Sequence, residues 1–264
     1  MSKIISYIRR NGLPITVQRV SNELRNIVYN NYYKINAHKY VRSFYGVLMR
    51  ANWEDTTFTF CINASYGYYY SNYLRKIDFP FILFDIGANQ GLYSLLAARN
   101  RKCIAVFAFE PVEKTYSILL DNIKKNGFSK IINPVEAAVS SESGFATINV
   151  KQGHSGVSSL TVVVDVNNQN TEVIKLMDRR DMERLVDQDA RIVVKIDVEG
   201  HEEVVIKEIS ECSFFDRVES IFYEIDESWS ESSVIEFQLR QKGITKFEKI
   251  GNGKHYDVFA SRVP

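Results

Sequence analysis

The sequence predicts an α/β fold built on a mostly parallel sheet with helices on both faces, and two observations lead to it. The segment from Phe81 to Pro111 (FILFDIGANQGLYSLLAARNRKCIAVFAFEP) reads as strand, glycine turn, helix, strand and carboxylate. After it, short apolar runs keep alternating with helical patterns, which is typical of a doubly wound sheet. Such sheets bind ligands at the carboxyl ends of their strands, so we expect the functional residues there.

Residues 1–76 are predicted to form an α+β extension before a main domain at 77–264. We expect a helix from Ile4 to about Tyr33, broken at 12–14 and with Ser21 as an internal cap. Strands are expected at 39–50 and 56–62, where β-branched and aromatic residues are frequent. A tyrosine cluster follows (Tyr66, Tyr68, Tyr69, Tyr70 and Tyr73). Its rings could hold a sugar or an adenine face, but filling the seam between extension and core is the simpler interpretation.

The extension is basic, although the whole chain carries a net charge of only +1. Residues 1–80 hold eleven Lys or Arg against four acidic residues, and the remainder carries a net charge of −6. A basic leader could steer an anionic substrate or a lipid-linked or phosphate-bearing glycan, or it could make transient contact with the inner membrane surface. Because the basic residues form no dense cluster, a solvated helical face is the simpler interpretation.

The glycine turn is the most informative motif of the main domain. The apolar run Phe81–Phe84 predicts a buried parallel strand that ends at Asp85. Gly87 and Gly91 then bracket a turn that can take positive φ and let a ligand approach the main chain. Asn89 tolerates a left-handed conformation and can donate its amide. Leucines and alanines over 92–97 repeat at helical spacing, so the turn opens a helix whose N-terminus favours an anionic group.

The next strand, Ile104–Phe109, ends at Glu110, which can accept two hydrogen bonds from a ribose diol. The spacing Gly87-Ala-Asn-Gln-Gly91 is G-x-x-x-G rather than the G-x-G-x-x-G that packs a pyrophosphate. It therefore suits a nucleoside cofactor without a pyrophosphate, such as S-adenosylmethionine, with its amino acid end over the turn and its ribose at Glu110. The alternative is a turn whose glycines serve only tight packing.

Later elements follow in alternation. We expect a helix over 116–125 ended by Asn126-Gly127, strands at 131–139, 191–197 and 218–225, and helices beginning at 201 and 235. Residues 145–150 and 161–166 read as a β insertion, with a loop at 153–159 that could close on substrate. Residues 246–250 and 255–261 read as a closing hairpin.

Acidic residues gather at the predicted ends of adjacent strands. Asp197 and Glu199 follow one strand, with His201 next, and Glu224 and Asp226 end the following strand. His201 is the simplest general base and Asp197 could orient an acceptor or act as base, although a helix cap is its alternative role. Carboxylates at neighbouring strand ends could also hold a divalent metal. Lys195, inside an apolar strand, is expected to form a structural ion pair.

The chain resembles the FkbM family of S-adenosylmethionine-dependent methyltransferases from Pro80 to about Glu224. The motifs are DIGANQGLYS at 85–94, FEP at 109–111, EAAVSSESG at 136–144, GVSSL at 156–160 and KIDVEGHE at 195–202. A segment at 176–182 departs from the T-L-D-D-L-like pattern of many relatives. The resemblance implies a Rossmann-like seven-stranded methyltransferase fold with a C-terminal antiparallel hairpin. From the positions of these residues at the turn and at the strand ends, we expect one set to hold the cofactor (Asp85, Gly87, Asn89, Gly91, Glu110 and Pro111) and four others to carry the reaction (Asp197, Glu199, His201 and Glu224).

The resemblance points to O-methylation of a sugar in a glycan or glycan precursor, or of a polyketide-like metabolite. Two other classes remain open: a nicotinamide-dependent oxidoreductase and a non-catalytic nucleoside-binding module. A nucleic-acid partner is not expected, because no N-P-P-Y-like motif for an extruded base is present and the catalytic half is acidic. Three scattered cysteines, with neither a signal sequence nor an apolar run of transmembrane length, predict a cytoplasmic protein. The oligomeric state cannot be predicted from these patterns.

Overall fold

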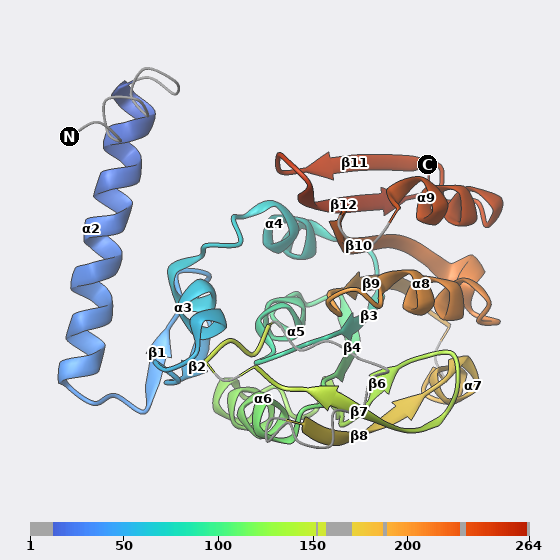
Figure 1. The fold of residues 1–264 in the computed structure, drawn as a ribbon, viewed down its shortest axis with the longest axis horizontal. Helices are drawn as coiled ribbons and strands as arrows, with labels where there is room; N and C mark the ends of the chain where they lie inside the picture. Colours follow the sequence, from blue (N-terminus) through green and yellow to red (C-terminus); the bar gives the residue numbers. More distant parts are fainter. Residues whose placement is uncertain (1–12, 152, 157–170, 187–188, 228–230, 263–264) are drawn as a thin grey trace. The chain divides into compact units, whose positions relative to one another are not determined.

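A computed structural model describes residues 13–151, 153–156, 171–186, 189–227 and 231–262 (Figure 1). The chain divides into two compact units, Met1–Val41 and Arg42–Pro264. The predicted functional division after residue 76 stays a prediction.

The described part of the first unit is dominated by one long helix, α2 (Leu13–Ile35). Pro14 lies in its first turn, where proline costs no hydrogen bond, so the predicted break coincides with the start of the helix. Ser21 lies inside the uninterrupted helix and does not cap it. Strand β1 (Tyr40–Arg42) spans the boundary between the units. None of the described helices combines the length and apolar character that a membrane crossing requires.

The expected strand at 56–62 is wrong, because these residues form helix α3 (Thr56–Asn63). Asp55 caps this helix by accepting a hydrogen bond from the Thr57 N–H at 2.8 Å. Phe58, Cys61 and Ile62 are buried on one helical face. The cap and this buried face outweigh the β propensity of the individual residues. Within the other predicted strand region, β2 (Leu48–Arg50) is short, and helix α4 (Tyr69–Lys76) carries much of the tyrosine cluster.

The second unit contains the predicted seven-stranded sheet, with strand order β11-β12-β10-β9-β3-β4-β5. The parallel strands are β3 (Phe81–Ile86), β4 (Cys103–Phe109), β5 (Ile132–Val135), β9 (Arg191–Ile196) and β10 (Val218–Asp226). The predicted C-terminal hairpin, β11 (Lys246–Ile250) and β12 (His255–Ser261), joins the sheet by antiparallel pairing of β12 with β10. The fold class is confirmed: a mostly parallel, Rossmann-like sheet with an antiparallel edge.

The helices of this unit connect the strands and cover the sheet (Figure 1). They are α5 (Leu92–Ala98), α6 (Glu113–Asn126), α7 (Arg179–Glu183), α8 (Glu202–Ser210) and α9 (Ser232–Gln241), with a 3₁₀ turn at Phe215–Arg217. Helix α6 ends at Gly127 with φ 77°, as predicted from the Asn-Gly pair. From β3 the chain proceeds to β4 and β5 on one side, and β9 and β10 lie on the other. This reversal of strand order opens a crevice at the carboxyl end of the sheet.

A second, three-stranded sheet has the order β6-β8-β7 and includes the predicted strand at 145–150. Its strands are β6 (Ala138–Val139), β7 (Gly144–Asn149) and β8 (Thr171–Met177). The predicted strand at 131–139 is therefore divided between β5 and β6, which belong to different sheets. The predicted strand at 161–166 lies outside the described residues. Strand β8 had not been predicted, and the divergent segment at 176–182 forms its end and the start of α7.

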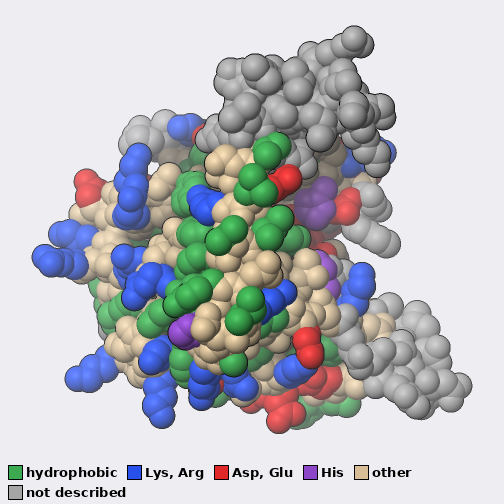
Figure 2. Space-filling view, turned by 90° about the vertical axis from the view of Figure 1, so that its left-hand side faces the viewer, with side chains coloured by type: hydrophobic (Ala, Val, Ile, Leu, Met, Phe, Trp, Pro, Cys, Tyr) green, Lys and Arg blue, Asp and Glu red, His purple; other side chains and the backbone are tan. Residues whose placement is uncertain are grey.

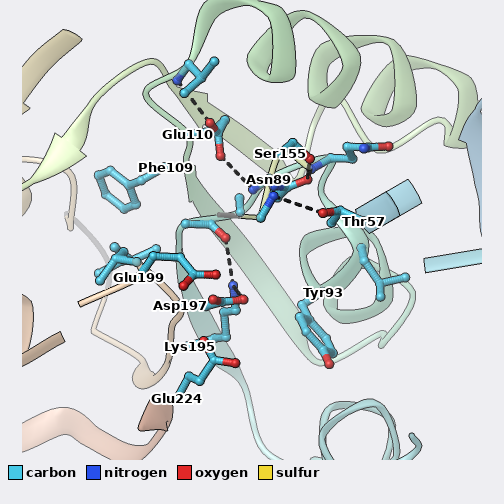
Figure 3. A pocket seen from close by; sticks show the side chains of 18 of the residues that line it. Thr57, Asn89, Tyr93, Phe109, Glu110, Ser155, Lys195, Asp197, Glu199 and Glu224 are labelled. Atoms are coloured by element: carbon cyan, nitrogen blue, oxygen red, sulfur yellow. Dashed lines mark hydrogen bonds and ion pairs between the residues drawn. The ribbon is translucent and has the colours of Figure 1, made fainter. Parts of the chain in front are cut away.

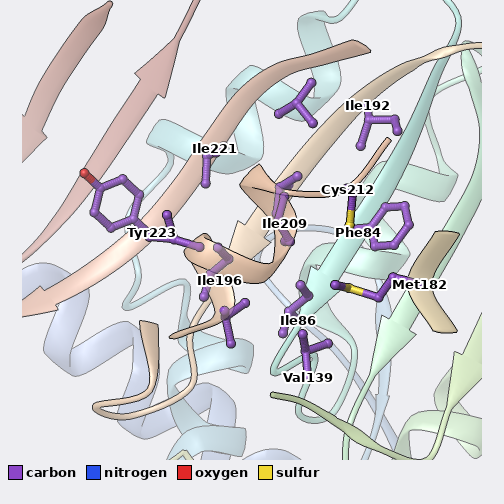
Figure 4. Packing of buried hydrophobic residues seen from close by; sticks show 14 of the residues in the cluster. Phe84, Ile86, Val139, Met182, Ile192, Ile196, Ile209, Cys212, Ile221 and Tyr223 are labelled. Carbon is purple, nitrogen blue, oxygen red and sulfur yellow. The ribbon is translucent and has the colours of Figure 1, made fainter. Parts of the chain in front are cut away.

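The largest hydrophobic core lies between the main sheet and the helices after β9 and β10 (Figure 4). All six residues of β3 are buried, which fits a central strand covered on both faces. Phe84 and Ile86 from β3 share this core with Ile196 from β9 and Ile209 from α8. A rigid centre of this kind fixes the strand ends that carry the polar residues.

Candidate active site

A cavity of about 820 Å³ opens at the carboxyl ends of β3, β4, β9 and β10 (Figure 3). It lies where the reversal of strand order predicts a ligand site. Its walls come from the glycine turn, the ends of these strands, the small sheet, helix α3 and residues 153–156. The volume falls within the range of ligand pockets, roughly 300–1,000 Å³.

The glycine turn packs closely against its neighbours. Gly87 has φ +73°, and a Cβ there would lie 1.8 Å from the Asp197 carbonyl oxygen. Gly91 has φ +86°, and its Cβ would lie 2.4 Å from Leu119 Cδ1. Tight packing thus explains both glycines, although Gly87 also lines the cavity and Gly91 does not. Asn89 has φ 51°, as predicted for a left-handed position.

Glu110 lies at the tip of β4, beside the turn. Its carboxylate accepts hydrogen bonds from the Asn89 N–H at 2.9 Å and the Val112 N–H at 3.1 Å. Burial raises the pKa of Glu110 to about 7, although these two hydrogen bonds oppose the shift. Each oxygen keeps a further lone pair, so the ionised group can still accept two ribose hydroxyls. Pro111 follows in the cavity wall.

Lys195 joins the turn to the end of β9. Its ammonium lies 3.6 Å from Asp85 and 3.3 Å from Asp197, and it donates a hydrogen bond to the Gly87 carbonyl at 2.8 Å. Burial opposes this charge, but the two carboxylates raise the pKa of Lys195 above its ordinary value. Asp85 also accepts a hydrogen bond from Ser94 at 2.6 Å and does not line the cavity. The expected structural pairing of Lys195 is confirmed.

Three carboxylates from neighbouring strand ends converge in the cavity: Asp197, Glu199 and Glu224 offer oxygens within 4.8 Å of one another. Glu199 has φ 50°, a left-handed conformation that is uncommon for a residue with a side chain. Burial and then Asp197 raise the pKa of Glu199 to about 7 and that of Glu224 to about 8. The side chains of Asp197, Glu199 and Glu224 lie close together beside Lys195 in Figure 3.

A family model described as the Methyltransferase FkbM domain matches residues 85–247, which include the turn, Glu110 and the converging carboxylates. The chain belongs to the FkbM methyltransferase family. It is therefore an S-adenosylmethionine-dependent methyltransferase. A comparison with curated proteins finds no match.

Solved structures similar to the FkbM chain have low sequence identity. TrmK of M. capricolum, in complex with S-adenosylhomocysteine, is 12% identical, with 74% of this chain and 67% of that chain covered and a TM-score of 0.45. Precorrin-6y C5,15-methyltransferase of Geobacter metallireducens is 13% identical, with 74% and 86% covered and a TM-score of 0.43. TYW2 of M. jannaschii, in complex with AdoMet, is 15% identical, with 86% and 88% covered and a TM-score of 0.43.

Two of the three histidines that line the FkbM site, His201 and His255, lie in different surroundings. His201 lines the cavity and its Nε2 lies 3.1 Å from the Ser140 hydroxyl, and burial lowers its pKa. His255, on β12, makes a short hydrogen bond through Nε2 to Glu224. This bond raises the pKa of His255, and Asp226 lies 3.8 Å from its Nδ1. No sequence motif marks His255, since only the pairing of β12 with β10 brings it to the carboxylates.

Residues before the FkbM domain also contribute to the site. Thr57 and Phe60 from α3 and Tyr66 after it line the cavity. Residues 153–156 lie against α3, since the Gly156 N–H bonds the Thr57 hydroxyl at 3.0 Å. Ser155 bonds the Asn89 side chain at 3.0 Å. The glycine- and serine-rich composition of 153–159 predicts a loop near the strand ends. The contribution of α3 to the cavity wall could not be predicted, because residues 56–62 were expected to form a strand.

The tyrosine cluster has mixed roles. Tyr70 is buried and stacks on Phe222 at 4.2 Å between ring centroids, while Tyr73 bonds Ser220 at 2.7 Å. These two rings fill the seam against the main sheet, as the simpler interpretation had it. Tyr66 instead lines the cavity.

Proposed function

We propose that the protein transfers a methyl group from S-adenosylmethionine to a hydroxyl oxygen of a sugar in a glycan or glycan precursor. The observation that carries this proposal is the continuity of one cavity from Glu110, at the end of β4, to the carboxylates at the ends of β9 and β10. A nucleoside cofactor and an oxygen nucleophile can be placed at its two ends.

The cofactor would lie with its ribose hydroxyls on Glu110. Its adenine would lie on the apolar part of the wall, formed by Phe109, Ala138 and Val139. Its amino acid end would then reach the turn at Gly87 and the region of Asp197. This orientation directs the methyl group toward the converging carboxylates.

The chain's residues would orient the acceptor and receive its proton. In an in-line displacement, the acceptor oxygen bonds to the methyl carbon as the carbon–sulfur bond breaks, which leaves neutral S-adenosylhomocysteine. Glu224 is our candidate base, because burial brings its pKa to about 8, close to physiological pH. Asp197 would orient the hydroxyl, and Glu199 would complete the carboxylate set.

His201 remains a second candidate for the base. In that role its imidazole would have to turn from Ser140 toward the acceptor, because that hydroxyl is its hydrogen-bond partner. Variants Glu224→Gln and His201→Asn separate the two possibilities. A base contributes about 10²–10⁴-fold to the rate, so only the substitution of the true base should cause a loss of that size.

The carboxylate set also suits a hard divalent cation such as magnesium, with Asp197, Glu199 and Glu224 as oxygen ligands. Such an ion would lower the pKa of the acceptor hydroxyl. Lys195 already provides positive charge to Asp197, and His255 provides it to Glu224 when its imidazole is protonated. A methylation assay with chelator, followed by added magnesium, tests this requirement.

A polyketide-like acceptor is the second candidate substrate. The polar groups at the reactive end, which include carboxylates and His255, favour a hydroxyl-rich molecule over an extended apolar one. We propose that the reaction takes place in the cytoplasm, and the free, buried thiols of Cys61, Cys103 and Cys212 support a reducing compartment. Basic side chains are dispersed among hydrophobic ones on the face shown in Figure 2, which allows transient contact with an anionic membrane surface.

The deciding experiment combines binding and transfer. Calorimetric titration should show that the protein binds S-adenosylhomocysteine and does not bind NAD. In a separate assay, a methyl label should pass from S-adenosylmethionine to a glycan-containing fraction of a cell extract. Binding of NAD without S-adenosylhomocysteine would point to an oxidoreductase. Cofactor binding without transfer to any fraction would point to a non-catalytic module.

A further inference from the structure

An aromatic wall borders the reactive end of the cavity. Phe60 and Tyr66 line it and are 37% and 43% exposed. Their rings lie edge to face with centroids 5.9 Å apart, and Tyr66 lies 6.4 Å from Tyr93. Unlike Tyr70, these two rings are not enclosed by the core, so a ligand can stack on them.

A carboxylate wall borders the same space. It consists of Asp197, Glu199 and Glu224, and Figure 3 shows these side chains with Tyr93 on the other side of Lys195. The Tyr66 ring lies 6.4 Å from Tyr93, and Lys195 Nζ lies 5.8 Å from the Tyr93 ring and 3.3 Å from Asp197. Tyr93 and Lys195 therefore connect the two walls. A ring-sized ligand would contact both walls at once.

Two neutral polar groups in the lining lack partners. Gln90 is 1% exposed, and neither its Oε1 nor its Nε2 has a hydrogen-bond partner. His154 Nδ1 is also buried without a partner, and its ring lies 6.2 Å from Phe60. Both residues line the cavity. Because buried polar groups are normally paired, this lining is suited to a ligand rich in donors and acceptors.

The charges of the lining are one-sided. The described lining residues include five carboxylates (Glu110, Asp197, Glu199, Glu224 and Asp226), a single lysine and no arginine. That lysine, Lys195, already faces Asp85 and Asp197 and bonds the Gly87 carbonyl. His255 also lines the cavity, but it is already hydrogen-bonded to Glu224, and Asp226 lies 3.8 Å from its Nδ1. A carboxylate or phosphate on the acceptor ring would therefore meet like charge without a free cation.

We propose that the acceptor is a neutral or amino sugar ring that stacks on Phe60 and Tyr66 while its hydroxyl or ammonium groups bond the carboxylate wall, and that acidic sugars are rejected. This specificity rests on the proposed methylation of a glycan. Exposed aromatic faces suit the C–H face of a sugar, and carboxylates accept hydrogen bonds from its hydroxyls. If so, the basic residues of the extension do not guide an anionic sugar into this cavity.

The first test identifies the labelled sugar. Purified full-length protein transfers a methyl label from S-adenosylmethionine to a glycan extract at pH 8.5, above the raised pKa values of Glu199 and Glu224. The glycan is hydrolysed, and the labelled monosaccharide is separated by anion exchange. We expect the label in the neutral or amino sugar fraction. Label in a uronic acid or a phosphosugar would overturn the specificity, and label in a non-sugar product would overturn the glycan acceptor itself.

The second test measures binding without turnover. The protein saturated with S-adenosylhomocysteine is applied to an array of neutral, amino and acidic glycans. Binding should be confined to the first two groups, and Phe60→Ala and Tyr66→Ala should each weaken it by about tenfold or more. Phe237→Ala is the matched control, because Phe237 is 67% exposed on α9 and is not among the described lining residues.

Preferential binding of acidic glycans would overturn the proposal, as would the absence of binding to any neutral or amino glycan. If Phe60→Ala and Phe237→Ala changed glycan binding equally, the aromatic wall would have no role in binding the acceptor. Calorimetry measures the affinity of each variant for S-adenosylhomocysteine. An unchanged affinity shows that weaker glycan binding does not come from damage to the cofactor site.

Discussion

Gly87→Ala tests whether the close approach of the turn to β9 shapes the cofactor site. Gly127→Ala is the matched control, since the two residues have nearly equal φ values of 73° and 77°. A Cβ on Gly127 meets nothing within 4 Å, whereas one on Gly87 would lie 1.8 Å from the Asp197 carbonyl oxygen. The left-handed conformation costs about 1–2 kcal/mol in either variant. Only Gly87→Ala must also push two strand ends apart.

The extra cost can be estimated from the bonds at this contact. The Asp197 N–H donates to the Ile86 carbonyl at 3.1 Å, and Lys195 donates to the Gly87 carbonyl at 2.8 Å. The loss of each of these two hydrogen bonds lowers the free energy of unfolding by about 0.5–1.5 kcal/mol more. We therefore expect Gly87→Ala to lower the free energy of unfolding by about 2–5 kcal/mol, and Gly127→Ala by about 1–2 kcal/mol.

Urea unfolding followed by circular dichroism measures the two free energies. Calorimetry with S-adenosylhomocysteine measures the site, where Gly87→Ala should weaken binding by about tenfold or more and Gly127→Ala should not. Equal losses of stability in the two variants, together with unchanged cofactor affinity, would refute the role given to this contact.

Three further predictions concern charged groups. Lys195→Met should lower the free energy of unfolding in urea by about 3–5 kcal/mol, because it leaves buried Asp85 without its cation, and adding Asp85→Asn should restore part of the loss; no recovery would argue against the pair. Since the pKa of Glu110 is raised to about 7 and ribose binding requires the ionised form, S-adenosylhomocysteine affinity should fall below pH 7 in calorimetry, and Glu110→Gln should abolish this dependence; a persistent pH dependence in the variant would point to another group. Glu199, whose pKa is raised from 4.5 to about 7, contributes stability that is fully present below pH 4.5 and is lost as pH rises through about 7, so Glu199→Gln should flatten the decline in Tm between pH 5 and 8; parallel curves for variant and parent would contradict this.

Much of the fold could be predicted because its signals are local. The buried run of β3, the glycine turn, Glu110 and the Asn-Gly end of α6 are each encoded within a few neighbouring residues. Alternation of strands and helices then limits the sheet to a few topologies. The position of Glu110 beside the turn followed directly from this order.

The remaining features depend on contacts between distant residues. Helix α3 was mispredicted because burial of Phe58 and the Asp55 cap outweigh local β propensity. His255 reaches Glu224 only through the pairing of β12 with β10. Gln90 and Tyr66 lie in sequence patterns that do not distinguish a residue of a cavity wall from a residue of the core. Their surroundings depend on residues that are distant in the sequence and close in the fold.

His255 lies on β12, which pairs between β10 and β11 although it follows both of them in the chain. Because a domain generally folds as a unit during synthesis, the sheet cannot be completed until His255 has left the ribosome. Glu224 would therefore gain its imidazole partner in the same step that closes the sheet.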